Sequence, residues 1–297
     1  MDSHELLRHA DVAMYHAKQL GRNTFQFFTQ AMNEEASQRL AREARIKVAH
    51  DRDEFINYYQ PIVNSQTGKA VGVELLLRWQ KDGSILAPSE FIVVAEEIGL
   101  IIPMTERAIE RALADLKTWC AIRSDFYISI NISALHFLKP GLRTYLAGLL
   151  ERFQIPPEQL KLEVTETTLI KEPDRAIEKM RSLKSLGVSL SLDDFGTGYS
   201  SLMYLKRLPL DVIKIDRAFV SGIGSDEKDQ AIVDATLVLA KSLGMQCVAE
   251  GVESEEQLNY LAQHKCYCIQ GFIYSKPEPE TQITQYLKDD KVEIKVQ

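Results

Sequence analysis

Two adjacent acids, Asp193 and Asp194, follow a stretch in which small polar residues alternate with Leu, and a glycine-rich turn comes after them. This alternation over residues 189–192 is typical of a short buried strand that ends at the acids. Two carboxylates at the end of a buried strand repel each other unless a cation or a shared proton neutralises them. The pair therefore indicates a positively charged partner, with a solvated Asp-Asp turn as the alternative.

Polar side chains recur at the carboxyl ends of the other strands that we predict. With the acid pair they form the candidate site: Glu74, Asn131, Glu163, Lys214, Asp216, Glu250 and Gln270. One acid on an apolar strand is as often a capping or surface residue. The same feature on strand after strand is typical of the active face of a barrel.

The candidate site is rich in carboxylate and amide oxygens and contains neither His nor Cys. Such ligands suit Mg²⁺ or Mn²⁺ rather than zinc. One aspartate of the adjacent pair could bridge two ions roughly 3.5 to 4 Å apart, which would activate water for displacement at phosphorus. These residues predict phosphodiester hydrolysis. A barrel glycosidase would need only an acid pair, and would leave Lys214 and Asn131 without a role.

Lys214 is directed into the site by strand parity, on the same face as Asp216. Its amine could reach a water between the metals and orient or deprotonate it. A structural ion pair between Lys214 and Asp216 is the alternative.

The elements that must position these residues alternate between strands and helices from residue 55 onward. The predicted strands span residues 55–63, 71–79, 126–133, 161–165, 188–193, 212–216, 246–250 and 267–271, and helical patterns span residues 103–120, 173–186, 230–243 and 255–264. This alternation predicts an α/β fold, a TIM-like (β/α)8 barrel. The short turn at residues 64–68 suits a hairpin, so the first strand should be antiparallel. Before the barrel, we predict a helix over residues 6–20, a strand over 24–28 and an amphipathic connecting helix over 29–50.

Composition limits the partners that the chain can take. A formal net charge of −7 argues against binding to a nucleic-acid polymer. The four cysteines show no C-x-x-C spacing, which argues against a structural zinc site or a redox pair. No signal peptide opens the chain and no apolar run reaches membrane-spanning length, so we expect a cytoplasmic location and no membrane contact by this fragment. Membrane tethering of a longer protein would require further N-terminal domains.

A series of short motifs runs along the barrel part of the chain. They are Y-Y-Q-P-I-V at residues 58–63, E-L-L-L-R-W from Glu74, N-I-S from Asn131, E-V-T-E-T from Glu163, D-D-F-G-T-G-Y-S-S-L from Asp193, I-K-I-D around Lys214, A-E-G-V-E around Glu250 and Q-G-F from Gln270. Together they resemble the EAL domain, a family of cyclic di-GMP phosphodiesterases. The resemblance covers residues 53–287. It implies a TIM-like barrel with an antiparallel first strand that cleaves cyclic di-GMP to linear pGpG with two Mg²⁺ or Mn²⁺ ions. Ca²⁺ should inhibit, because it prefers longer bonds and polarises water less.

The resemblance also implies a role for each site residue. Glu74, Asn131, Glu163 and Asp193 match ligands of the first metal, and Asp193 and Asp194 match those of the second. Lys214 matches the residue that orients or deprotonates the attacking water, and Glu250 matches the acid that holds a water near it. Gln60, Arg78 and Gln270 match positions that touch the guanine and phosphates, and we group Asp216 with them. Glu166 matches the acid that fixes the D-F-G-T-G loop.

One residue departs from the family signature, since Leu75 stands where the family name has Ala. Period two directs Glu74, Leu76 and Arg78 into the barrel and Leu75 outward, so the extra bulk should strain the outer packing layer rather than the metal site. The alternative function is a degenerate EAL domain that binds cyclic di-GMP as a receptor without cleaving it. Such domains typically lose the metal-binding acids or the loop, and this chain keeps both.

The resemblance divides the chain into three parts. We predict an EAL domain at residues 51–290, a linker helix at 29–50, and a C-terminal remnant of a GGDEF diguanylate cyclase domain at 1–28, based on A-D-V-A-M-Y-H-A-K-Q-L-G-R-N from Ala10. EAL domains commonly pair beside the D-F-G-T-G loop, which predicts a homodimer through residues 199–208. That surface would present Tyr199, Leu202, Tyr204 and Leu205, and burial of these residues in the barrel's own outer layer is the alternative.

Overall fold

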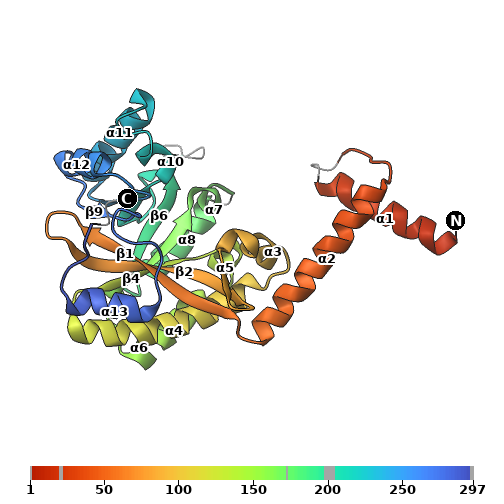
Figure 1. Cartoon of the computed structure of the whole chain (residues 1–297), viewed down its shortest axis with the longest axis horizontal. Coiled ribbons are helices and arrows are strands. Elements are labelled where there is room, and N and C mark those ends of the chain that lie inside the picture. Colours follow the sequence, from red (N-terminus) through yellow and green to blue (C-terminus); the bar gives the residue numbers. More distant parts are fainter. Residues whose placement is uncertain (1, 20–22, 172, 197–204, 295–297) are drawn as a thin grey trace.

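A closed barrel forms the centre of the computed structural model, which describes residues 2–19, 23–171, 173–196 and 205–294 (Figure 1). Its sheet has the strand order β1-β9-β8-β7-β6-β5-β4-β2-β3, and an additional pairing of β1 with β2 closes the ring and leaves β3 at its edge. The strands are β1 (Phe55–Asn64), β2 (Lys69–Lys81), β3 (Ser84–Leu86), β4 (Tyr127–Asn131), β5 (Leu160–Thr165), β6 (Ser189–Phe195), β7 (Val212–Ile215), β8 (Gln246–Ala249) and β9 (Cys268–Ile269). The predicted TIM-like barrel is confirmed.

The first strand, β1, runs antiparallel to both of its neighbours, β2 and β9. The other pairs within the ring are parallel. The turn after β1 is tight because the side chain of Asn64 accepts hydrogen bonds from the backbone N–H groups of Gln66 and Thr67. A reversal this short cannot hold a crossover helix, so it forces antiparallel pairing, as predicted.

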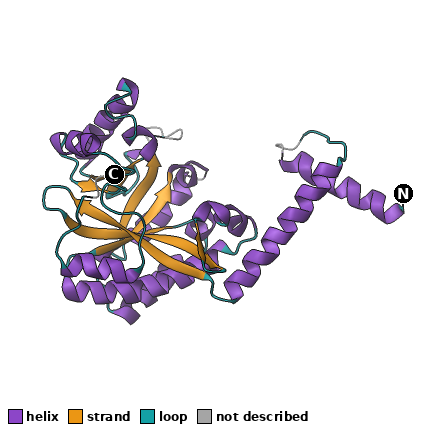
Figure 2. Cartoon of the chain, in the orientation of Figure 1, coloured by secondary structure: helices purple, strands orange, loops and turns teal. Residues whose placement is uncertain are grey.

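Helices surround the strands, as the purple ribbons around the orange sheet in Figure 2 show. Around the barrel they are α3 (Ile92–Glu97), α4 (Ile101–Ile122), α5 (Ala134–Leu138), α6 (Leu142–Phe153), α7 (Glu166–Lys171), α8 (Pro173–Lys184), α10 (Arg217–Val220), α11 (Glu227–Leu243), α12 (Glu255–Gln263) and α13 (Glu280–Lys288). Their apolar faces and the outward side chains of the strands form the main core, in which α4 buries Leu113, Leu116 and Trp119 completely. The core thus lies between the two layers and leaves the interior of the barrel for other side chains.

Two helices, α1 (Ser3–Gln19) and α2 (Gln30–Asp51), extend from the barrel as an arm (Figure 1). The hydroxyl of Thr29 caps the start of α2 by accepting a hydrogen bond from the backbone N–H of Met32. At the other end, Arg107 of α4 donates to the carbonyl of His50 at 2.8 Å, and Arg111 forms an ion pair with Asp53. The arm is therefore attached to the barrel through α4, and also through α3, where Glu97 forms an ion pair with Arg39 of α2 at 3.1 Å.

The sequence-based boundaries differ from the structure in a few places. The strand predicted at residues 24–28 is wrong, because no described strand lies beside these residues to complete backbone hydrogen bonds, and Phe25 and Phe27 are largely exposed. The prediction did not include β3, which pairs only with the end of β2. It also did not name six of the described helices of the barrel, α3, α5, α6, α7, α10 and α13. The longer helices and the ring strands lie where the periodicity places them, within a few residues.

The predicted dimer surface lies mostly outside the described residues, since these do not include 197–204. Of the proposed contacts, Leu205 is described, and it is 2% exposed because it packs into the outer core of its own barrel. In the described ranges, no helix is long and apolar enough to cross a membrane.

Candidate active site

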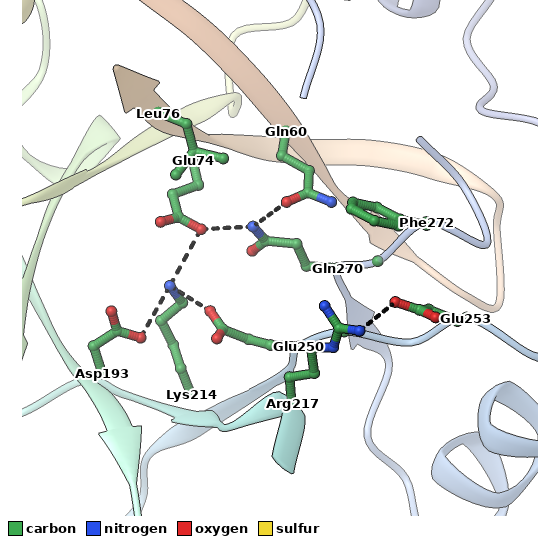
Figure 3. A pocket seen from close by; sticks show the side chains of 12 residues that line it. Gln60, Glu74, Leu76, Asp193, Lys214, Arg217, Glu250, Glu253, Gln270 and Phe272 are labelled. Atoms are coloured by element: carbon green, nitrogen blue, oxygen red, sulfur yellow. Dashed lines mark hydrogen bonds and ion pairs between the residues drawn. The ribbon is translucent and has the colours of Figure 1, made fainter. Parts of the chain in front are cut away.

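Lys214 of β7 lies inside the barrel at the carboxyl ends of the strands, and it is 1% exposed. Its ammonium group contacts four carboxylates, and Figure 3 shows three of them, Glu74, Asp193 and Glu250. The distances from Nζ to the nearest oxygens are 2.5 Å to Glu250, 2.6 Å to Glu163, 3.2 Å to Asp193 and 3.3 Å to Glu74. Asp216 is not among these partners, so the alternative Lys214–Asp216 ion pair is absent from this described part of the chain. Lys214 and these four carboxylate side chains are hereafter the Lys214 centre.

Glu74 of β2 is oriented by amide side chains. Asn131 donates from Nδ2 to Oε1 of Glu74 at 2.6 Å, and Gln270 donates from Nε2 to Oε2 at 2.6 Å. Gln270 also donates to Oε1 of Gln60 at 3.1 Å, while Gln60 donates to the carbonyl of Ser275 at 3.0 Å. The two glutamines predicted to touch the ligand thus form a buried chain of hydrogen bonds that ends on Glu74.

Glu163 of β5 accepts hydrogen bonds on both of its carboxylate oxygens. Lys214 donates to Oε2 at 2.6 Å, and the hydroxyl of Ser129 donates to Oε1. Ser129 precedes Asn131 by two residues on β4 and therefore shares its inward face. Ser129 is not among the residues predicted from the sequence, although its alternation with Asn131 in I-S-I-N is a usable signal.

The charges of the Lys214 centre do not balance, because four carboxylates share one ammonium. Burial opposes the charge of Lys214, but Glu163, Glu250 and the other acids raise its pKa well above the usual value. Burial and the neighbouring acids raise the pKa of Glu250 to about 8, and burial raises the pKa of Glu163 well above its usual range. This surplus of acids makes the centre an attractive position for further cations.

Asp193 and Asp194 lie at the end of β6, where the ladder to β7 is interrupted. Asp194 has a left-handed backbone with φ of 55°, which departs from the strict alternation of a strand. Burial and the nearby carboxylates of Asp193 and Asp216 raise the pKa of Asp194 to about 6. Asp216 also caps α10, where it accepts a hydrogen bond from the backbone N–H of Ala218 at 2.7 Å. A second group of acids thus adjoins the Lys214 centre.

Two other predicted residues lie farther from Lys214. Glu166 accepts a hydrogen bond from the backbone N–H of Gly196 at 3.4 Å, at the start of the glycine-rich loop whose next residues lie outside the described ranges. Arg78 donates to the carbonyl of Leu77 at 2.9 Å, and its guanidinium carbon lies 5.8 Å from the ring centroid of Tyr58. Arg78 is therefore beside the site and not in direct contact with the acids that surround Lys214.

A cavity of about 220 Å³ opens over the Lys214 centre. Its wall includes Leu76, as period two predicts, together with Arg217 and Phe272. The side chain of Arg217 crosses Gly251 so closely that any Cβ there would collide with it, and its guanidinium lies 3.3 Å from Glu253. Arg217, the cation at the rim of the cavity, is not among the residues predicted from the sequence, although it directly follows I-K-I-D.

The side chains of the site fit divalent cations in donor type and charge. All the candidate ligands offer oxygen, and Oδ1 of Asp193 is buried without a hydrogen bond, although Nζ of Lys214 lies 3.2 Å away. In the described part of the chain, no three acidic, His or Cys side chains are placed to hold a metal ion, and Nζ of Lys214 takes the middle of the site. Binding of cations would therefore replace ion pairs of Lys214 by bonds to the same acids.

The fold and site together define a class, an irregular (β/α)8 barrel with an antiparallel first strand and an acidic centre at the carboxyl ends of its strands. The EAL domain family matches residues 42–277, and the chain belongs to this family. The assignment of residues 1–28 to a GGDEF remnant stays a prediction.

Two curated relatives are similar to this chain over almost its whole length. It is 40% identical over 282 residues to the bifunctional diguanylate cyclase/cyclic di-GMP phosphodiesterase MucR of Pseudomonas aeruginosa, a match that covers 94% of this chain and 41% of MucR. It is 36% identical over 286 residues to the cyclic di-GMP phosphodiesterase NbdA of the same organism, covering 96% of this chain and 36% of NbdA. The chain thus spans less than half the length of these relatives.

Solved structures show the same fold. The structure described as "PaMucR Phosphodiesterase, c-di-GMP complex" has a TM-score of 0.78 and 38% identity, and the match covers 83% of this chain and 99% of that one. The cGMP-bound form of the EAL enzyme Bd1971 has a TM-score of 0.82 and 33% identity, covering 86% of this chain and 71% of that one.

Proposed function

We propose that this chain hydrolyses cyclic di-GMP to linear pGpG with two Mg²⁺ or Mn²⁺ ions and that Ca²⁺ inhibits it. Membership of the EAL family and similarity to proteins named as cyclic di-GMP phosphodiesterases support the substrate. The observation that carries the proposal is the Lys214 centre, in which four carboxylates lie within 3.3 Å of one ammonium at the active face of the barrel.

The site residues would have two roles, metal binding and orientation of the attacking water. The cations would be held by Glu74, Asn131, Glu163, Asp193 and Asp194. When bound, such ions stabilise charge on the phosphate and lower the pKa of water. Nζ of Lys214 and Oε1 of Glu250, which lie 2.5 Å apart, would orient the attacking water. Lys214 would take its proton only once bound cations have replaced the carboxylate contacts that raise the pKa of its ammonium.

Binding of the ligand would use the groups around this centre. Gln60, Gln270, Arg78 and Asp216 would contact its bases and phosphates, and Arg217 adds a positive charge at the rim of the cavity. Glu166 would hold the glycine-rich loop in place through Gly196.

One assay tests the proposal and separates it from the receptor alternative. The purified chain is incubated with cyclic di-GMP and Mg²⁺ or Mn²⁺, and the products are separated by chromatography. We expect linear pGpG. Tight binding of cyclic di-GMP without any product would instead favour the receptor, even though all the acidic positions are present.

A further inference from the structure

We propose that Ser129 is a positioning residue for metal binding. Its hydroxyl holds Oε1 of Glu163, so that Oε2 remains directed toward the middle of the site. The inference rests on the proposed function, in which Glu163 is a metal ligand, and it adds a residue to which neither the motifs nor the relatives assign a role.

Ser129 and Glu163 belong to neighbouring strands and are both enclosed in the barrel. Ser129 is 2% exposed on β4, and Glu163 is 1% exposed on β5. The two strands pair in parallel with Asn131 opposite Glu163, so Ser129 lies one inward position deeper, beneath the carboxylate. A hydroxyl has a single proton to donate, and this one is donated to Glu163.

The two oxygens of Glu163 have different partners, and this difference gives Ser129 its role. Oε2 faces Nζ of Lys214, at the point where the four carboxylates converge. A cation bound there would compete with Nζ for Oε2, whereas the hydrogen bond from Ser129 to Oε1 lies on the other side of the carboxylate. The terminal torsion of a glutamate is broad and roughly two-fold, so the hydrogen bond from Ser129 adds to that from Lys214 in fixing this rotation, and it would remain when a cation displaces Nζ from Oε2.

Hydrogen bonds of this kind matter for metal affinity. Partners that orient a ligand and fix its protonation typically change metal affinity or activity by about 10- to 100-fold when they are removed. Ser129 should therefore affect the binding of the ion while leaving the ligands themselves in place.

The barrel supplies a matched control in Ser191 of β6. Ser191 stands opposite Glu163 in the β5–β6 ladder and is 1% exposed. Within the described residues, its hydroxyl has no hydrogen-bond partner. Ser129 and Ser191 are thus the same residue type, equally buried beside the same acid, and only the former donates to Glu163.

The experiment compares Mn²⁺ binding by the full chain and by Ser129→Ala, Ser191→Ala and Ser129→Thr. Binding is measured by titration calorimetry and by the electron paramagnetic resonance of free Mn²⁺, both without cyclic di-GMP. We expect Ser129→Ala to weaken Mn²⁺ binding by about 10- to 100-fold. Ser191→Ala should bind like the unmutated chain, and Ser129→Thr should restore binding because it keeps the hydroxyl.

A second measurement separates positioning from a merely structural role. The Mn²⁺ concentration that gives half-maximal hydrolysis should rise in Ser129→Ala, while kcat at saturating Mn²⁺ stays closer to that of the unmutated chain. Melting temperatures measured without metal establish that each variant is folded.

Three outcomes would overturn the inference. Ser129→Ala could bind Mn²⁺ as tightly as the unmutated chain and differ only in melting temperature, which would make Ser129 structural. Ser191→Ala could weaken binding equally, which would assign the effect to any lost hydroxyl. If the unmutated chain binds no Mn²⁺, the proposed function fails and the role of Ser129 fails with it. The titration of the unmutated chain shows this result before any variant is compared.

Discussion

The two ends of the barrel interior each enclose a lysine, and the surroundings of the two lysines are opposite. At the carboxyl end, Lys214 is surrounded by four carboxylates that raise its pKa. At the amino end, Lys161 of β5 is 9% exposed, its ammonium lies 3.6 Å from the ring centroid of Tyr127, and burial lowers its pKa. One side-chain type therefore carries a stabilised charge at one end of the barrel and a disfavoured charge at the other.

Packing around the two lysines explains the difference. The amino end is filled by apolar side chains, including Ile62, Val212 and Val248, and Gly72 leaves space for the ring of Tyr127. The carboxyl end instead collects acids, which are costly to bury unless cations or ligands compensate them. The comparison indicates that the amino end stabilises the barrel and that the carboxyl end is arranged for chemistry.

Removal of metal should have the largest effect on the hydrolysis of cyclic di-GMP, and it acts on the carboxyl end of the barrel alone. In excess chelator we expect hydrolysis of cyclic di-GMP to stop, because the water and the phosphate then lose their activating cations. Chromatography of the products measures this, with Mg²⁺ added back as the control and Ca²⁺ as a poor substitute. Full turnover in excess chelator would contradict the two-metal proposal.

Replacement of Lys214 should have the second-largest effect on turnover. We expect Lys214→Met to lower turnover by roughly 10²- to 10⁴-fold, the usual contribution of a group that orients or deprotonates water. Binding of cyclic di-GMP, measured by calorimetry in Ca²⁺, should persist because the carboxylates and amides remain. Near-normal turnover of the folded variant would remove Lys214 from the catalytic residues.

The sequence predicts the carboxyl end better than the amino end, for a physical reason. Period two and the position of polar residues at strand ends place Glu74, Glu163 and Lys214 on one face, and the structure brings them together. Arg217 escapes prediction because its role depends on a close approach to Gly251, which is a feature of three-dimensional packing. The hydrogen-bonded chain from Gln60 to Glu74 likewise joins strands far apart in sequence.

For the amino end, the sequence does not indicate which group Lys161 contacts. In the sequence, Lys161 is an ordinary charged residue at the start of a strand, and its place over Tyr127 follows from the parallel pairing of β4 with β5 and from the space that Gly72 leaves for the ring. Local patterns predict the direction of a side chain, whereas its partner depends on which strands become neighbours.

Gly72→Ala tests whether the amino end acts through packing. A Cβ at this position would lie 2.5 Å from the ring of Tyr127, so we expect the free energy of unfolding to fall by about 1 to 3 kcal/mol. The matched control is Gly148→Ala in α6, where a Cβ meets nothing within 4 Å and the helix should gain up to about 1 kcal/mol. Denaturant unfolding measures both. Equal effects of the two substitutions would argue against tight packing at the amino end.

Lys161→Met should have the smallest effect, and it completes the comparison with Lys214→Met. The substitution removes a cation–π contact worth about 0.5 to 2 kcal/mol, and it also removes a charge whose burial is unfavourable. Because methionine retains an unbranched apolar stem, we expect the free energy of unfolding to change by no more than about 1 kcal/mol. Turnover of cyclic di-GMP should stay close to that of the unmutated chain, since Lys161 lies beneath the acids and lines no part of the cavity over Lys214. Thermal unfolding and the product assay are carried out on both methionine variants side by side. If Lys161→Met lost turnover as severely as Lys214→Met while remaining folded, the two ends of the barrel would be functionally joined, and the separation argued from their packing would be wrong.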